Sequence, residues 1–240
     1  MIWYISDLQE NPAAFLVFVA AFSVAVLTGL AFHEFCHAWS ANELGDDTAK
    51  RQGRLTLNPM KHLDPIGTTL LFVMGFGWAK PVMVNPWRLR IGPRRGHALV
   101  AFAGPASNFF FAALAAIPIR LGLIALGDDV ARQGQGMTVI EAVIRFGDGM
   151  DYAWLFLSFI IGLNILLGIF NLIPIPPLDG FRVLTGIVPR EIARGLEQIA
   201  PWGPGILMAF IALGFLTGRS PIIWVINLVY DDILGIILGT

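Results

Sequence analysis

Charged side chains are scarce in this sequence. Asp, Glu, Lys and Arg make up 14% of the 240 residues against 56% hydrophobic residues, and the mean hydropathy is +0.70. That composition is far from the one found in soluble globular domains. The only cysteine, Cys36, excludes an intrachain disulfide. The sequence has no basic tract that would indicate nucleic-acid binding, and its first twelve residues lack the Lys or Arg of a cleaved signal peptide.

Several uncharged runs are long enough, or nearly so, to cross a bilayer, for which about 20 apolar residues are needed. The long runs cover 12–32, 98–119 and 152–178, shorter ones cover 66–79 and 203–218, and a last run from Pro221 is interrupted by Asp231 and Asp232. These runs predict an all-α polytopic membrane protein with about six transmembrane or partly inserted helices.

The charged residues that do occur are segregated, and this predicts an orientation. Lys and Arg gather in segments 50–61, 88–95 and 182–194, whereas the loop 127–151 is acidic. The positive-inside rule places the basic segments in the cytoplasm and the loop outside. The run 66–79 lies between two basic segments, so we expect it to enter the membrane and return. The Gly- and Pro-rich stretch 77–86 then forms a turn or a short strand.

The motif HEFCH (residues 33–37) lies at the end of the first apolar run. His33 and His37 are four residues apart and therefore project from one face of a helix. That spacing suits two ligands of one tetrahedral zinc, and Glu34 between them can act as a general base in hydrolysis. Five-residue matches arise by chance, but ionisable groups at membrane depth are costly, which favours a functional site here. We expect Cys36 to be a small core residue.

A catalytic zinc needs a third protein ligand, and Asp179 is the preferred candidate. It ends an uncharged run as NLIPIPPLDG, where three prolines break the helix and Gly180 permits a tight turn. The alternatives Glu43, Asp46 and Asp47 lie in a polar loop that we expect to be solvated. We expect His62 and His97 to be interfacial or core residues.

The sequence resembles the site-2 protease family of intramembrane zinc metalloproteases. The resemblance is carried by HEFCH, LNPMKHLDPIGT (57–69), GWAKPVMVNP (77–86), AGPASN (103–108) and NLIPIPPLDG (171–180). It implies that His33, His37 and Asp179 bind one Zn²⁺ and that Glu34 is the general base. It also implies that Asn171 polarises the scissile carbonyl or holds its oxyanion. For Asn108 in AGPASN we favour helix packing over a role in the site.

The position of the site predicts a substrate and a location. Because the site is carried on apolar helices, we expect the substrate to be a membrane-anchored protein that is cleaved within or at the cytoplasmic border of its transmembrane helix. We expect an integral multi-pass protein of a prokaryotic plasma membrane, and the basic segments place its active site toward the cytoplasm. We expect a single domain over 1–240, with a catalytic core at about 12–185, C-terminal helices at 186–240, and neither a PDZ nor a CBS domain.

Two other classes of protein remain as alternatives. A metal transporter or channel would also carry ionisable residues in its membrane helices, but such proteins tend to show paired repeats, which this sequence lacks. An inactive zinc-binding membrane protein would need the ligands but not Glu34, so the glutamate favours an enzyme.

Overall fold

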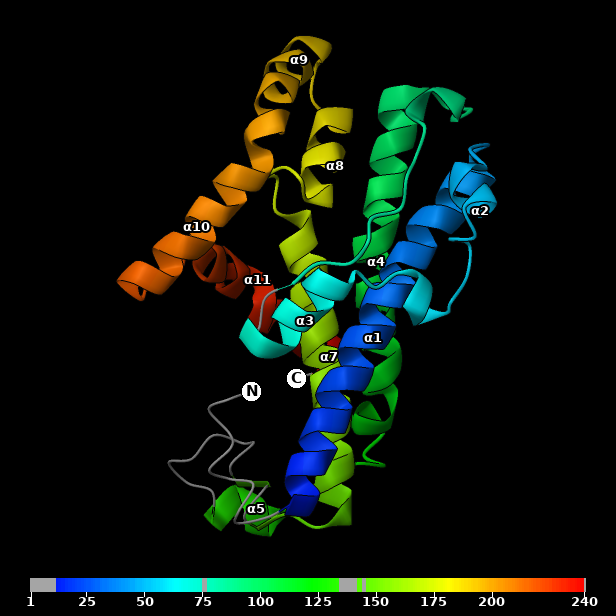
Figure 1. Ribbon diagram of the computed structural model, residues 1–240. Coiled ribbons are helices and arrows are strands. Elements are labelled where there is room, and N and C mark those ends of the chain that lie inside the picture. Colours follow the sequence, from blue (N-terminus) through cyan, green and yellow to red (C-terminus); the bar gives the residue numbers. More distant parts are fainter. Residues whose placement is uncertain (1–11, 75–76, 134–141, 144–145, 240) are drawn as a thin grey trace.

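Three long helices form the centre of the molecule (Figure 1). The computed structural model describes residues 12–74, 77–133, 142–143 and 146–239. The long helices are α1 (Pro12–Glu43), α4 (Pro93–Arg120) and α7 (Gly149–Leu172), and each packs against the other two. Their contacts use small residues, with Ala21, Ala25, Ala38, Ala112 and Ala116 fully buried. Small side chains let membrane helices approach closely. Van der Waals packing can then hold the bundle together, although surrounding lipid is as apolar as the helices and gives no hydrophobic driving force for their association.

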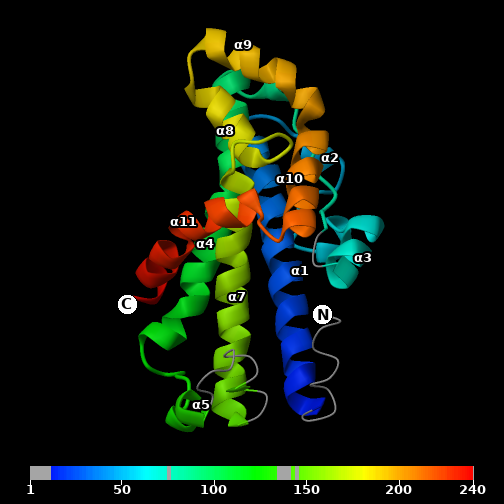
Figure 2. The same ribbon diagram turned by 90° about the vertical axis from the view of Figure 1, so that its left-hand side faces the viewer.

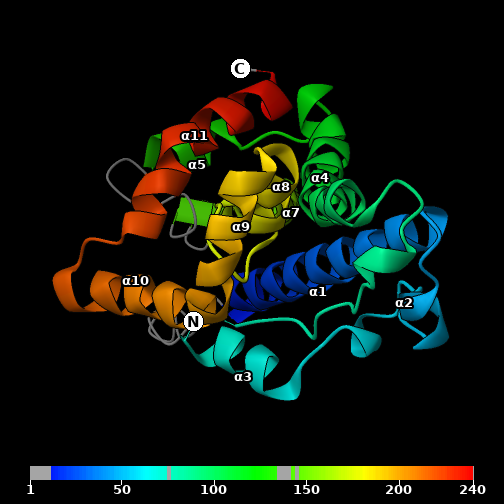
Figure 3. The ribbon, with the colours of Figure 1, turned by 90° about the horizontal axis from the view of Figure 1, so that it is seen from above.

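The remaining helices surround this bundle. They are α2 (Thr48–Arg51), α3 (Pro65–Met74), α5 (Asp128–Gln133), α8 (Asp179–Ile187), α9 (Arg190–Ile199), α10 (Gly203–Thr217) and α11 (Pro221–Leu238), with 3₁₀ turns η3 (Pro59–Lys61), η4 (Pro86–Arg88) and η5 (Ala200–Trp202). Seen from above, α10 and α11 lie on the opposite side of the molecule from α2 (Figure 3).

The prediction of an all-α polytopic membrane protein is confirmed. Within the described residues, five helical segments are long and apolar enough to span a membrane, one of them running through α9 and α10. The expected total of about six counted a partly inserted segment, which corresponds to the ten-residue α3. This helix lies at mid-height of the bundle in two perpendicular views (Figures 1 and 2).

The charged segments lie at opposite ends of the bundle. Helices α2 and α9, which carry basic residues, lie at one end and α5 lies at the other (Figure 1). This arrangement agrees with the segregation of charge along the chain, and the assignment of the basic end to the cytoplasm stays a prediction. Residues 1–11, for which the sequence predicts no cleaved signal peptide, and part of the acidic loop (134–141 and 144–145) lie outside the described residues.

The stretch 77–86, called here the extended segment, lies beside α1, where Val82 N–H donates to the carboxylate of Glu34. Among the described residues it makes one antiparallel bridge, between Ala79 and Leu63, and Lys80 N–H donates to the His62 carbonyl at 2.8 Å. The expected turn or short strand is therefore an extended stretch with one bridge. Buried Arg54 donates from its guanidinium to the carbonyls of Lys61, Lys80 and Pro81.

Asp46 anchors the other end of the extended segment. Its carboxylate accepts the Asn85 N–H at 2.6 Å and the Thr48 N–H at 3.1 Å. Asp46 is 0% exposed, so the expectation of a solvated loop is wrong at this position. An extended backbone has no internal hydrogen bonds, and this carboxylate supplies an acceptor that the sequence pattern did not reveal.

Candidate active site

His33 and His37 lie one turn apart on α1, and the fold brings Asp179 to them. The two Nε2 atoms are 2.9 Å apart, and Asp179 Oδ2 is 3.0 Å from His33 Nε2 and 3.2 Å from His37 Nε2. Both imidazoles are buried, and their rings meet edge to face. The structure thus places together the three residues that sequence reasoning selected, although 142 positions separate His37 from Asp179.

Helix α4 sets the protonation pattern of both imidazoles. His33 Nδ1–H donates to Asn108 Oδ1 at 2.7 Å, and His37 Nδ1–H donates to the Val100 carbonyl at 2.7 Å. A neutral imidazole that carries its proton on Nδ1 presents an unprotonated Nε2. Two nitrogen lone pairs and a carboxylate oxygen therefore converge on one point, and such a set of acceptors is suited to a cation.

The donor set fits zinc in chemistry and size. The three ligand atoms, from His33, His37 and Asp179, lie within 4.8 Å of one another. Zinc bonds of about 2.0–2.2 Å place tetrahedral ligand atoms about 3.4 Å apart, so these side chains need to separate by only a few tenths of an ångström. Second ring nitrogens bonded to carbonyl oxygens are usual for histidines that bind zinc.

The break after α7 positions Asp179, which begins α8. Gly180 has a different role from the expected turn, because its φ is not positive. A Cβ there would lie 2.1 Å from the Leu172 carbonyl oxygen, so glycine is needed for close packing of α8 against the end of α7.

Gly104 is a site residue that sequence reasoning missed. A Cβ at this position would lie 2.5 Å from His37 Nε2 and 2.6 Å from His33 Nε2. The absence of a side chain on α4 therefore makes room for both imidazoles and for whatever they bind. The available signal was a glycine inside AGPASN in the middle of a membrane helix, where its low helix propensity needs a reason.

Glu34 faces the extended segment. Its carboxylate is buried, and Oε2 accepts the Val82 N–H at 3.0 Å. It lies outside the cluster of three ligand atoms formed by His33, His37 and Asp179.

The other candidates divide into those near the site and those apart from it. Asn108 hydrogen-bonds His33 directly, so the preference for a helix-packing role alone is not supported. Asn171 donates from Nδ2 to the Leu167 carbonyl of its own helix at 3.0 Å.

His97 is half-buried on α4, within electrostatic reach of Asp179. His62 is buried, and its ring nitrogen donates to the Thr56 carbonyl at 2.7 Å.

The acidic residues considered as alternatives to Asp179, and Cys36, lie outside the cluster of ligand atoms. Glu43 is exposed at the end of α1, and Asp47 pairs with Arg51 and Arg88 at the surface. Cys36 is partly buried, and it too lies outside the cluster of ligand atoms.

Comparison with known proteins agrees with this geometry. The model of peptidase family M50 matches residues 21–211. The chain belongs to this family, the site-2 protease family. It is 40% identical over 212 residues to "Putative zinc metalloprotease YwhC" of Bacillus subtilis, and the match covers 88% of each chain. It is 29% identical over 225 residues to "Putative zinc metalloprotease Rip2" of Mycolicibacterium smegmatis, covering 90% of this chain and 74% of the relative.

Membership of family M50 confirms the family resemblance drawn from the motifs. Together with the apolar helices, it identifies the chain as a membrane metalloprotease, and the names of its relatives indicate zinc as the metal. No solved structure matches this chain.

Proposed function

We propose that this protein is an intramembrane zinc protease that cleaves a peptide bond within, or at the cytoplasmic border of, a transmembrane helix of another protein. The observation that carries the proposal is the convergence of His33, His37 and Asp179 inside a bundle of membrane helices, with Glu34 beside an extended segment. We assign the first three residues as the ligands of one Zn²⁺ and Glu34 as the general base.

The ligands and Glu34 divide the chemistry between them. Zinc, when bound, supplies Lewis acidity that polarises a carbonyl and makes a water molecule nucleophilic near neutral pH. Glu34 takes the proton of the attacking water and passes it to the nitrogen of the departing amine. Its hydrogen bond from Val82 N–H supports this role, because a fixed donor on one oxygen orients the carboxylate and leaves the other oxygen free for the proton.

Asn171 is the proposed donor to the developing oxyanion. One hydrogen of its amide nitrogen is used on the Leu167 carbonyl, which fixes the side chain against α7. The second hydrogen of the same nitrogen can be donated to substrate. A neutral amide suits this position because it costs less to bury than a cation and still stabilises negative charge.

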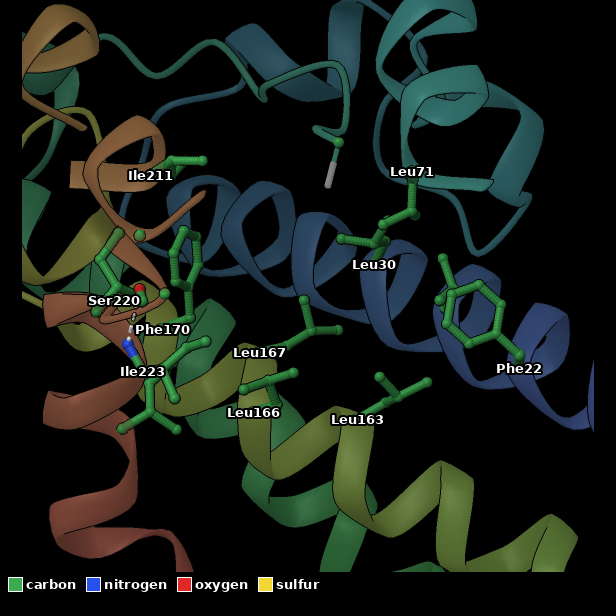
Figure 4. A pocket seen from close by; sticks show the side chains of 16 residues that line it. Phe22, Leu30, Leu71, Leu163, Leu166, Leu167, Phe170, Ile211, Ser220 and Ile223 are labelled. Carbon is green, nitrogen blue, oxygen red and sulfur yellow. Dashed lines mark hydrogen bonds between the residues drawn. The ribbon is translucent and has the colours of Figure 1, made fainter. Parts of the chain in front are cut away.

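An apolar cavity supports lateral arrival of a substrate helix from the membrane. The cavity is about 490 Å³ and lies between α1, α3, α7, α10 and α11. Figure 4 shows Leu30 and Leu71 facing Leu167 across it. Leu30 is one turn before Glu34 on α1, and the Leu167 carbonyl is the one that Asn171 binds. An apolar segment in this cavity would therefore lie next to the proposed catalytic groups.

A substrate helix must open before it is cut, because its carbonyls are hidden in internal hydrogen bonds. Exposed backbone groups in lipid cost several kcal/mol each unless a partner satisfies them. The extended segment can supply partners by pairing with the opened peptide as an added strand. Gly or Asn near the cut should lower the opening cost by up to about 1 kcal/mol each.

The same proposal includes an orientation and a location. The site lies toward the end of α1 that adjoins basic α2, so we place it on the cytoplasmic side of a prokaryotic plasma membrane. We treat residues 1–240 as one membrane-embedded protease domain. Cysteine labelling from each side at position 92, in a Cys36→Ala background, should react from the cytoplasm; reaction from outside would reverse the topology.

The deciding experiment is cleavage of a single-pass membrane reporter by the purified protein in liposomes. Mass spectrometry of the products should place the cut inside the reporter helix or at its cytoplasmic border. Introduction of Gly or Asn near the cut should accelerate cleavage, and Glu34→Gln should abolish it. Cuts confined to a soluble loop, and insensitive to these substitutions, would mean that the enzyme is a membrane-tethered peptidase of ordinary substrates.

A further inference from the structure

Asn164 of α7 is a fully buried amide in a stretch, 159–170, that has no other polar side chain. Asn164 and Asn108 are each 0% exposed. Asn108 Nδ2 donates to Asn164 Oδ1 at 3.0 Å, and Asn164 Nδ2 donates to the carbonyl of Ile160 on its own helix at 2.8 Å. With the bond from His33 to Asn108, these contacts form a continuous chain from α7 through α4 to α1.

The chain has a direction, and each step fixes the next. The Ile160 carbonyl can only accept, so it takes the amide nitrogen of Asn164 and turns Oδ1 toward Asn108. Asn108 Nδ2 therefore donates one hydrogen to Asn164 Oδ1. It donates the other to the Gly29 carbonyl oxygen, which lies 3.2 Å from Nδ2 and can only accept. The oxygen of Asn108 is therefore left for His33, and it requires the proton of the imidazole to be on Nδ1.

The reverse orientation of Asn108 would disable His33 as a ligand. If the amide turned over, Nδ2 would face His33 Nδ1, which would then have to accept. The imidazole proton would move to Nε2, the atom that faces Asp179 and His37. A protonated Nε2 has no lone pair for a metal, so the orientation of the Asn108 amide decides whether the site has three ligands or two.

His37 shows why one histidine needs this support and the other does not. Its Nδ1 donates to the Val100 carbonyl, a main-chain group that can act only as an acceptor. The tautomer of His37 is therefore set by one contact. A side-chain amide presents a donor or an acceptor with equal ease, so Asn108 needs further partners to choose between them.

The packing around Asn164 has made room for this amide. Gly29 on α1 lies opposite it, and a Cβ there would be 3.0 Å from Asn164 Oδ1 and 3.1 Å from Leu167 Cδ1. A buried amide in a membrane helix is costly, and here its oxygen and nitrogen both have partners across or along the helices.

We propose that Asn164 is a positioning residue for the metal site, acting through Asn108 to hold His33 in the tautomer that binds zinc. The proposal rests on the metal site described under the proposed function. Asn164 hydrogen-bonds Asn108 and Ile160 and none of the three proposed ligands, so its effect should appear in metal binding and should depend on Asn108.

The test measures the zinc Kd of the purified protein by competition with a chromophoric chelator. Loss of an outer partner of a ligating histidine typically costs 10–100-fold in affinity, so Asn164→Leu should raise the Kd by about tenfold. Asn164→Asp keeps an acceptor for Asn108 and should bind zinc within about threefold of the wild-type protein. The visible spectrum of bound Co²⁺ should change in Asn164→Leu and be normal in Asn164→Asp.

Two controls separate positioning from general destabilisation. Ile165→Ala removes a neighbouring buried side chain from the same helix and should leave the zinc Kd unchanged despite lower stability. In an Asn108→Ala background, adding Asn164→Leu should cause no further loss of zinc affinity. An unchanged Kd in Asn164→Leu, or additive losses in the double variant, would overturn the proposal.

Gly29→Ala is a second variant should Asn164→Leu not fold. Its added methyl group must displace the Asn164 amide and should weaken zinc binding severalfold; an unchanged Kd would also overturn the proposal. If the wild-type protein itself binds no zinc, the proposed function fails. If it binds zinc normally but none of these variants alters the Kd, only the role of Asn164 fails.

Discussion

The proposed metal ligands and the extended segment both adjoin Glu34, yet different kinds of side chain hold the two regions in place. Around the ligands, on α1, α4 and α7, the groups are neutral amides and glycines: Asn108, Asn164, Gly29 and Gly104. The extended segment (77–86) is instead held by buried charged side chains, chiefly Arg54 and Asp46.

The difference follows from where each region finds its hydrogen bonds. A helix satisfies its own backbone, so polar side chains among packed helices are needed only to orient other side chains, and neutral amides do this at least cost. An extended backbone leaves its N–H and C=O groups unpaired. The Arg54 guanidinium and the Asp46 carboxylate supply several donors or acceptors at once and fix the segment across its length.

Zinc binding and catalysis should therefore be separable by mutation. Changes among the packed helices should alter metal affinity, and changes to the supports of the extended segment should alter turnover with zinc still bound.

Gly104→Ala should have the largest effect. The added methyl group would lie about where the two Nε2 atoms converge, so zinc binding should be abolished and proteolysis with it. Zinc content per chain, measured on purified protein, checks this. Gly162→Ala on α7 is the control, since its methyl group would meet only the hydroxyl of Tyr230. A Gly104→Ala protein with a full complement of zinc would refute the placement of the site against α4.

Asp179→Ala should weaken zinc binding by at least about 100-fold, because it removes the charged ligand and leaves two neutral imidazoles. Glu43→Ala and Asp47→Ala should leave the zinc Kd unchanged, since both side chains lie away from the ligand cluster. Unchanged metal content in Asp179→Ala, with loss in either control, would move the third ligand to the loop after α1.

Glu34→Gln should retain zinc and the fold but lower kcat by about 10²–10⁴-fold, the contribution typical of a general base. The glutamine can still accept the Val82 N–H through its amide oxygen, so the extended segment should keep its place. Cleavage of the membrane reporter and zinc content are measured on the same preparation. Near-normal turnover with zinc bound would remove Glu34 from the mechanism.

Arg54→Met should lower turnover by about 10–100-fold while zinc affinity is unchanged. The substitution keeps much of the buried volume but leaves the Lys80 and Pro81 carbonyls without their donor, at about 1–3 kcal/mol for each unsatisfied group. Arg51→Met is the matched control, because Arg51 is exposed and pairs only at the surface. If Arg54→Met lost zinc and turnover together, the two regions would not be independent.

Much of the fold could be predicted because a membrane helix is a local property. The uncharged runs at 12–32 and 98–119 became α1 and α4, and the prolines before Asp179 end α7 as expected. Gly180 was misinterpreted because a glycine after a proline-rich break suggests a turn, whereas the structure uses it for a close contact with Leu172. Asp46 was misjudged because one of the N–H groups that donate to its carboxylate, that of Asn85, lies 39 positions away in the sequence.

The sequence by itself determined the class of protein, the two histidines on one helical face, the glutamate between them and the candidate for a third ligand. These depend on composition, on four-residue spacing and on a break that prolines impose. Tertiary structure decided that Asn108 faces His33, that Gly104 leaves space for two imidazoles, and that Arg54 and Asp46 hold the extended segment. Such contacts depend on how neighbouring helices are rotated, on their relative depth and on main-chain groups far away in the sequence. The local spacing of residues along one segment determines none of these.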